Sequence, residues 1–183
     1  CNDIIKLFNI NNELYDGLTF NGVNKSVKDT KDLRIDTCSS PEWRRIFKFL
    51  SIELASNVKK FFKNISFIDP DSNEDVCFLR SQKLETYSMQ MQKYEKNSGK
   101  YIYHNDFNCE FKNKRLRQIT YMWYINDIEE GGETEFFDKH KIKPEAGKLV
   151  LFPANWTFLH KANIPLSDDK YIITGWLWEC FGE

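Results

Sequence analysis

The sequence predicts a mainly β fold, a sandwich or barrel supported by an N-terminal helix. Within residues 39–65, apolar side chains recur at steps of three and four residues, which is typical of an amphipathic helix. From about residue 83 onward, short segments rich in β-branched and aromatic residues alternate with Gly, Pro, Asn and Asp, which is typical of successive strands. A helix followed by many strands favours a β core with a helical support.

Composition and charge indicate a globular protein. The 183 residues fit one domain, with 15% aromatic and 29% charged residues and a formal net charge of −1, which gives no general attraction to nucleic acid or membranes. No apolar run approaches the roughly 20 residues of a spanning helix. The first residues lack the basic and apolar regions of a signal peptide, and five scattered cysteines without CxxC spacing fit reduced thiols. We therefore expect a soluble, cytoplasmic protein that does not bind a membrane.

The order of elements follows from local signals. Residues 1–38 are polar and interrupted by DG and NG, so we expect short strands and turns there. The helix is expected to begin at Pro41, with Ser40 as its N-cap and Glu42 near its positive end. Its predicted core-facing stripe is Trp43, Ile46, Phe47, Leu50, Leu54, Val58, Phe61 and Phe62.

A loop is expected over 67–76, and the strands are expected within 83–94, 117–126, 148–152 and 170–179. These elements predict a single domain over 1–183. In it, N-terminal strands and a helix, residues 1–84, support a β core formed by residues 85–183.

The segment YIYHNDFN, residues 101–108, contains a candidate metal site. His104 and Asp106 stand two positions apart, so on a strand they point to the same face. Of the two other histidines, His140 lies in a charged stretch and is expected to be exposed, whereas His160 follows an apolar strand and is the better third ligand. Two imidazoles and one carboxylate are the ligand set of non-haem Fe(II) oxygenases, with Zn²⁺ as the alternative.

Lys170 follows His160 at a distance that suits a cosubstrate site. If His160 ends one strand and 162–168 turns, Lys170 opens the returning strand beside it. Its ammonium would then reach the far carboxylate of a dicarboxylate that chelates the metal, which is a strong, charge-assisted contact. The alternative is a surface lysine at the start of a strand.

With these residues in place, the segment 85–178, about half of the chain, resembles the 2-oxoglutarate/Fe(II)-dependent dioxygenases of the prolyl 4-hydroxylase type. Four ordered blocks carry the resemblance: MQMQKYEKNSGKYIYHND, RQITYMWYINDIEEGGETEF, PEAGKLVLF, and His160 followed by Lys170 and Trp176. The resemblance implies a double-stranded β-helix, or jelly roll. It also implies a 2-oxoglutarate- and O2-dependent hydroxylase that yields succinate and CO2, with ascorbate as a further reductant.

The resemblance assigns His104, Asp106 and His160 as the Fe(II) ligands. Related halogenases have a small residue in place of the carboxylate, so the presence of Asp106 argues for hydroxylation.

The resemblance also assigns the remaining site. Lys170 would hold the C5 carboxylate of 2-oxoglutarate, Tyr94 and Thr134 would donate hydroxyl hydrogen bonds to it, and Trp176 would wall the pocket. Arg117 matches a position that faces the substrate groove. Two departures stand out. Tyr94 is one residue further from His104 than usual, which requires a bulge or a different loop, and the polar Gln92 replaces a usually apolar residue.

A proline-containing peptide or protein is the expected substrate, with residues 67–82 where a substrate lid would fall. A free amino acid, another protein side chain or nucleic acid is the alternative. The basic run KNKRLR, residues 112–117, would suit an acidic substrate or nucleic acid, but we expect a solvated turn there. A non-enzymatic jelly-roll binding module would lack the metal ligands, and a nucleic-acid demethylase would usually carry an arginine in place of Lys170 and a basic face.

Overall fold

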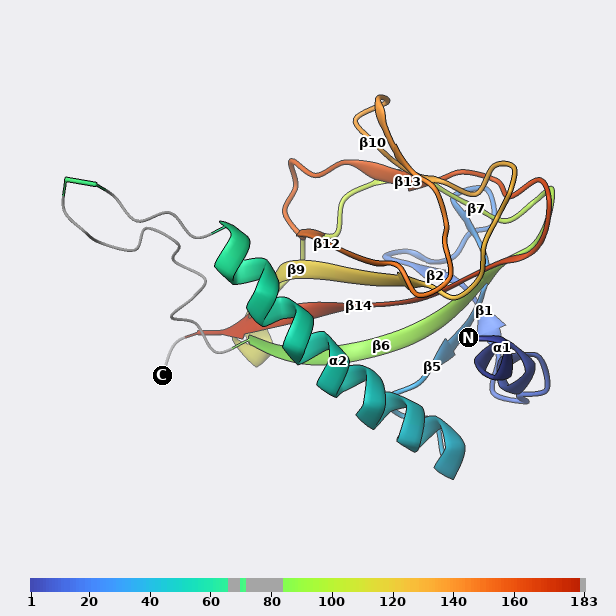
Figure 1. Cartoon of the computed structure of the whole chain (residues 1–183), viewed down its shortest axis with the longest axis horizontal. Helices are drawn as coiled ribbons and strands as arrows, with labels where there is room; N and C mark the ends of the chain where they lie inside the picture. The colour runs from blue at the N-terminus through green and yellow to red at the C-terminus, as the bar shows by residue number, and fades with distance from the viewer. Residues whose placement is uncertain (66–69, 72–83, 182–183) are drawn as a thin grey trace.

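Two antiparallel sheets face one another in the computed structural model, which describes residues 1–65, 70–71 and 84–181 (Figure 1). In the larger sheet the order is β1 (Tyr15–Asp16), β5 (Lys31–Arg34), β6 (Leu84–Tyr94), β14 (Lys170–Cys180), β9 (Arg115–Tyr124) and β12 (Leu149–Pro153), and β8 (Cys109–Glu110) also pairs with β9. In the smaller sheet the order is β11 (His140–Ile142), β10 (Thr134–Phe136), β13 (His160–Ala162), β7 (Lys100–His104) and β4 (Lys28–Asp29). This arrangement confirms the predicted mainly β jelly roll.

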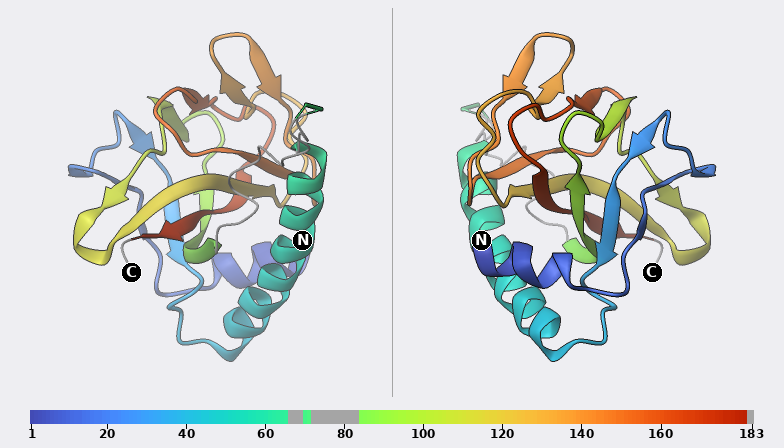
Figure 2. Two further views of the ribbon diagram at one scale, coloured as in Figure 1. Left: turned by 90° about the vertical axis from the view of Figure 1, so that its left-hand side faces the viewer. Right: turned by 90° about the vertical axis from the view of Figure 1, so that its right-hand side faces the viewer.

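Two helices lie on the side of the larger sheet that faces away from the smaller one (Figure 2). The long helix α2 (Pro41–Ile65) confirms the predicted boundaries, and its first-turn Trp43 N–H lies 3.5 Å from the Ser40 hydroxyl. Its predicted stripe packs into the main core, with Trp43, Leu50 and Leu54 fully buried. The apolar face of α2 packs on the outer face of the larger sheet, and the core between them stabilises that sheet.

The first residues form a helix rather than the strands expected for 1–38. Helix α1 (Asn2–Asn9) buries Phe8, whose ring makes an edge contact with Tyr171 at 5.9 Å between centroids. Ile4, Ile5 and Leu7 pack on the same core, so the three- and four-residue spacing of these apolar side chains decided the local structure. The remaining elements of this region are short strands, as expected, including the separate hairpin β2 (Leu18–Thr19) and β3 (Gly22–Val23).

Side-chain alternation along the central strands separates the core from the site. On β14, Tyr171, Ile173 and Leu177 belong to the main core, whereas Lys170 and Trp176 line a cavity between the sheets. Since neighbouring strand residues point to opposite faces, one strand serves both surfaces. Strands β6 and β9 show the same division.

The predicted loop 67–76 and the predicted lid 67–82 fall largely on residues 66–69 and 72–83, which lie outside the described residues. Strands from the N-terminal region 1–84 belong to both sheets, since β5 pairs with β6 and β4 pairs with β7. The assignment of residues 1–183 to a single domain stays a prediction. Within the described residues, neither helix has the length and apolar character needed to cross a bilayer.

Candidate active site

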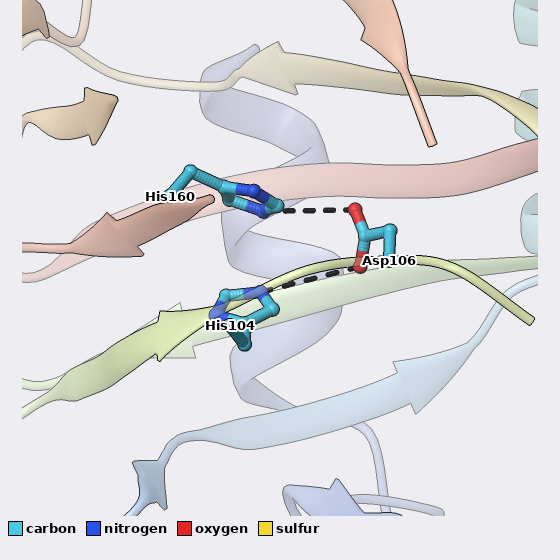
Figure 3. Close-up of side chains that lie close together, drawn as sticks. All are labelled: His104, Asp106 and His160. Atoms are coloured by element: carbon cyan, nitrogen blue, oxygen red, sulfur yellow. Dashed lines mark ion pairs between the residues drawn. The ribbon is translucent and has the colours of Figure 1, made fainter. Parts of the chain in front are cut away.

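Three side chains converge between the sheets, two from the end of β7 and the turn after it and one from the start of β13 (Figure 3). His104 ends β7 and His160 begins β13, and the two residues are register partners in the smaller sheet. Asp106 stands two residues after His104, with Oδ1 4.0 Å from His104 Nε2 and Oδ2 3.6 Å from His160 Nε2. One ligand atom from each residue lies within 4.8 Å of the others, so all three can reach a common ion.

Two details of the predicted geometry were wrong. Asp106 lies beyond the end of β7, so the chain turn after His104, rather than strand alternation alone, brings it to the site. His160 begins its strand instead of ending one, and Lys170 opens β14 in the opposite sheet. Lys170 therefore faces the histidines across the cavity, since the turn between them crosses from one sheet to the other.

Backbone carbonyls orient both imidazoles. His104 Nδ1 lies 2.8 Å from the Ile102 carbonyl oxygen, and His160 Nδ1 lies 3.0 Å from that of Phe158. Because a carbonyl oxygen only accepts hydrogen bonds, each Nδ1 carries a proton and donates it. Each Nε2 is then directed toward the space between the three side chains.

Asp106 is held by two neighbours on β9. The Thr120 hydroxyl donates to Oδ2 at 2.8 Å, and an Arg117 N–H donates to the Asp106 backbone oxygen at 3.3 Å. Sequence reasoning missed the role of Thr120. The period-two spacing of Thr120 and Met122, both on the cavity face, is the signal that could have indicated it.

The charges suit a cation. Burial, with help from neighbouring His160, lowers the pKa of His104 to about 4, so its imidazole is neutral at pH 7. Burial alone would raise the pKa of Asp106, but the two imidazoles, the Thr120 hydroxyl and Arg117 outweigh it and lower that pKa. Two imidazole nitrogens and one carboxylate are the donor set preferred by Fe(II) in open facial sites.

A cavity of about 430 Å³ extends from this cluster, and it brings the other predicted site residues together. These are Tyr94, Arg117, Thr134, Lys170 and Trp176. The exposed His140 lies outside the cavity, as predicted, although it stands on edge strand β11.

Lys170 is a buried cation at one end of the cavity. It is 1% exposed, its Nζ donates to the Gly132 carbonyl oxygen at 2.9 Å, and Nζ lies 4.1 Å from the centre of the Tyr94 ring. None of the ion pairs among the described residues includes Lys170. Burial lowers its pKa to about 7, with only Glu133 opposing the shift, so an anionic ligand would relieve an unfavourable charge.

Hydroxyl groups line the same end of the cavity. The Tyr124 hydroxyl donates to Thr134 Oγ1 at 2.7 Å, with the Ile142 carbonyl oxygen as a second acceptor at 3.3 Å. The Thr134 hydroxyl in turn donates to Met122 Sδ at 3.9 Å, and sulfur is a weak acceptor, so its proton is available to a ligand. The Tyr94 hydroxyl donates to Gln92 Oε1 at 3.0 Å. A turn over 95–99, in which Asn97 adopts a φ of 65°, follows Tyr94, and Tyr94 pairs directly with Lys170.

Arg117 lies toward the opposite end of the cavity, because it pairs with Trp178 near the end of β14, whereas Lys170 begins that strand. Its guanidinium carbon is 3.6 Å from the Trp176 ring centre and 4.9 Å from that of Trp178. Burial lowers the pKa of Arg117 to about 10, and its Nε has no acceptor among the described residues. The solvated turn expected for 112–117 is thus wrong for Arg115 and Arg117, which lie half-buried on β9 against aromatic rings.

Comparison with known proteins identifies the class. Residues 89–178 match the family model described as the 2OG-Fe(II) oxygenase superfamily. The chain belongs to this superfamily and is a 2-oxoglutarate-dependent dioxygenase that uses Fe(II).

Solved structures of similar fold include prolyl hydroxylases. One from Trichoplax adhaerens, in complex with a hypoxia-inducible factor oxygen degradation domain peptide fragment, has a TM-score of 0.69 and 19% identity, covering 97% of this chain and 76% of that one. A Pseudomonas putida prolyl-4-hydroxylase has a TM-score of 0.62 and 18% identity, covering 96% and 82%. The viral collagen prolyl hydroxylase of Paramecium bursaria Chlorella virus-1 has a TM-score of 0.59 and 21% identity, covering 85% and 81%. No curated protein matches. At these identities the likeness establishes the fold.

Proposed function

We propose that the chain hydroxylates proline in a peptide or protein, with 2-oxoglutarate converted to succinate and CO2. The observation that carries this proposal is one cavity that joins a two-histidine, one-carboxylate cluster to a buried lysine at one end and a half-buried arginine at the other. The prolyl hydroxylase fold of the three solved structures supports the choice of proline.

His104, Asp106 and His160 would hold the Fe(II). Bound Fe(II), with 2-oxoglutarate and O2, supplies the oxidising chemistry that replaces a substrate C–H bond by C–OH. The chain's part is to orient the ligands: the carbonyls of Ile102 and Phe158 accept hydrogen bonds from Nδ1 of each ring, so Nε2 is the nitrogen that faces the metal. Thr120 keeps Asp106 Oδ2 turned toward His160.

Lys170 would bind the far carboxylate of 2-oxoglutarate by a buried, charge-assisted contact. Thr134 would donate a second hydrogen bond, because Tyr124 already supplies the proton that its oxygen accepts. Tyr94 would donate a third, and Trp176 would wall the pocket. A need for ascorbate stays a prediction.

Arg117 would face the substrate. Its guanidinium is held in one orientation by Trp176, and it retains N–H donors suited to the carbonyl oxygens of an extended peptide. Because stacking on Trp176 already restricts the Arg117 side chain, little further conformational entropy is lost when a peptide binds.

The test is mass spectrometry of proline-containing peptides and of matched peptides with alanine in place of proline. We expect the gain of one oxygen atom on proline, dependent on 2-oxoglutarate. Arg117→Gln should raise the peptide KM about tenfold, since a charged hydrogen bond contributes about 1.5–3 kcal/mol, while the 2-oxoglutarate KM stays unchanged. Oxygen on the alanine peptides, or on free amino acids only, would contradict proline as the target.

A further inference from the structure

A buried polar chain runs from the N-terminal strands to the end of the cavity at Lys170. Lys28 on β4 and Asp32 on β5 form an ion pair, with Nζ 2.6 Å from Oδ2 and side chains 4% and 1% exposed. Because β4 belongs to the smaller sheet and β5 to the larger, this pair joins the two sheets where the chain crosses between them.

Gln92 continues the chain on the neighbouring strand. It is the register partner of Asp32, and its Nε2 donates to Asp32 Oδ2 at 3.3 Å. A carboxylate paired with an ammonium only accepts, so the amide nitrogen of Gln92 must face Asp32 and its carbonyl oxygen must face the other way. That oxygen accepts the Tyr94 hydroxyl proton at 3.0 Å.

We propose that Lys28, Asp32 and Gln92 form a relay, a chain of hydrogen bonds that fixes the orientation of the Gln92 amide. Through it, the Gln92 carbonyl oxygen competes with 2-oxoglutarate for the hydroxyl proton of Tyr94. This inference rests on the proposed function. Gln92 is 4% exposed and Tyr94 is 2% exposed, so neither has ready access to solvent as a substitute partner. Lys28 and Asp32 lie outside the matched segment 89–178, so the relay makes the N-terminal strands part of the cosubstrate pocket.

Competition follows from the count of protons. Tyr94 has one hydroxyl proton, and it is committed to Gln92. A carboxylate arriving at Lys170 can take that proton only if the bond to Gln92 breaks, which leaves a buried amide oxygen without a donor. The ion pair resists this loss, because Asp32 holds the amide in the orientation that suits Tyr94.

The experiment is calorimetric titration of 2-oxoglutarate into the Mn²⁺-loaded protein, with Gln92→Met as the principal variant and Gln92→Leu as the second. Both remove the amide and leave the Lys28–Asp32 pair. We expect 2-oxoglutarate to bind about fivefold more tightly, the equivalent of one hydrogen bond that need not break. In the Tyr94→Phe background the same substitutions should change nothing, because the hydroxyl through which they act is absent.

Gln90→Met is the matched control, since Gln90 lies two positions earlier on the same face of β6 and its register partners do not include Asp32. Thermal unfolding without ligand separates folding defects from binding. Unchanged or weaker binding by folded Gln92→Met, or an equal effect in the Tyr94→Phe background, would overturn the relay alone. Absence of 2-oxoglutarate binding by the wild type would overturn the proposed function and the relay together.

Discussion

His160→Ala should lower 2-oxoglutarate turnover on the order of a thousandfold. Loss of an outer-shell partner of a metal ligand typically costs 10- to 100-fold, so loss of a ligand itself should cost more. His160 also contacts both other members of the cluster, with Nε2 3.6 Å from Asp106 Oδ2 and its ring centroid 4.2 Å from that of His104. The remaining pair would offer one nitrogen and one carboxylate, too few to hold Fe(II) in a facial site.

His140→Ala is the matched control, because it removes an exposed imidazole on an edge strand. We expect normal turnover and normal Fe(II) binding from that variant. The measurements are succinate formation and Fe(II) retained after gel filtration. Succinate formation by folded His160→Ala at the wild-type rate would exclude His160 from the metal site.

Lys170→Met should raise the 2-oxoglutarate KM about a hundredfold while kcat at saturation falls much less. Removing one partner of a buried, hydrogen-bonded charge pair costs roughly 2–5 kcal/mol, and this partner acts at the far end of the cosubstrate from the metal. Methionine keeps most of the buried volume of the lysine stem, so the fold should persist. The control is Lys139→Met, which removes an exposed lysine.

The same variant tests the electrostatics without any ligand. The pKa of Lys170 is lowered to about 7 in the folded protein, whereas in the unfolded chain it has its ordinary value of 10.5. Between these values the unfolded chain binds more protons, so stability should rise with pH from about 7 to about 10.5. Lys170→Met should lack this rise relative to wild type. The measurement is the free energy of unfolding in urea as a function of pH. If it changed with pH in the same way for the wild type and Lys170→Met, Lys170 would not be a buried amine without an anionic partner.

Sequence patterns predicted the elements whose signals are local. The stripe of α2, the Ser40–Pro41 start and the four strand segments all depend on residues close in sequence, and the structure has them at the expected places. The residues predicted to meet, from Tyr94 to Trp176, do line one cavity, because the ordered motifs restrict how the strands can fold together.

Contacts between distant segments could not be predicted in the same way. Gln92 looked like a polar departure, and only the pairing of β5 with β6 shows Asp32 as its partner. The placement of Lys170 opposite His160 depends on a turn that crosses between sheets, and sequence spacing alone cannot distinguish that from a hairpin. Thr120 and Tyr124 act through side chains on β9 whose partners are 14 and 10 residues away.

The most direct measurement of the central claim is succinate production by the wild-type protein after metal removal and restoration. Treatment with a chelator should abolish succinate formation, Fe(II) should restore it, and Zn²⁺ should not, because Zn²⁺ accepts the same ligands but supplies no redox chemistry. Succinate formation that persists without metal, or that Zn²⁺ restores as well as Fe(II), would contradict an iron centre formed by His104, Asp106 and His160.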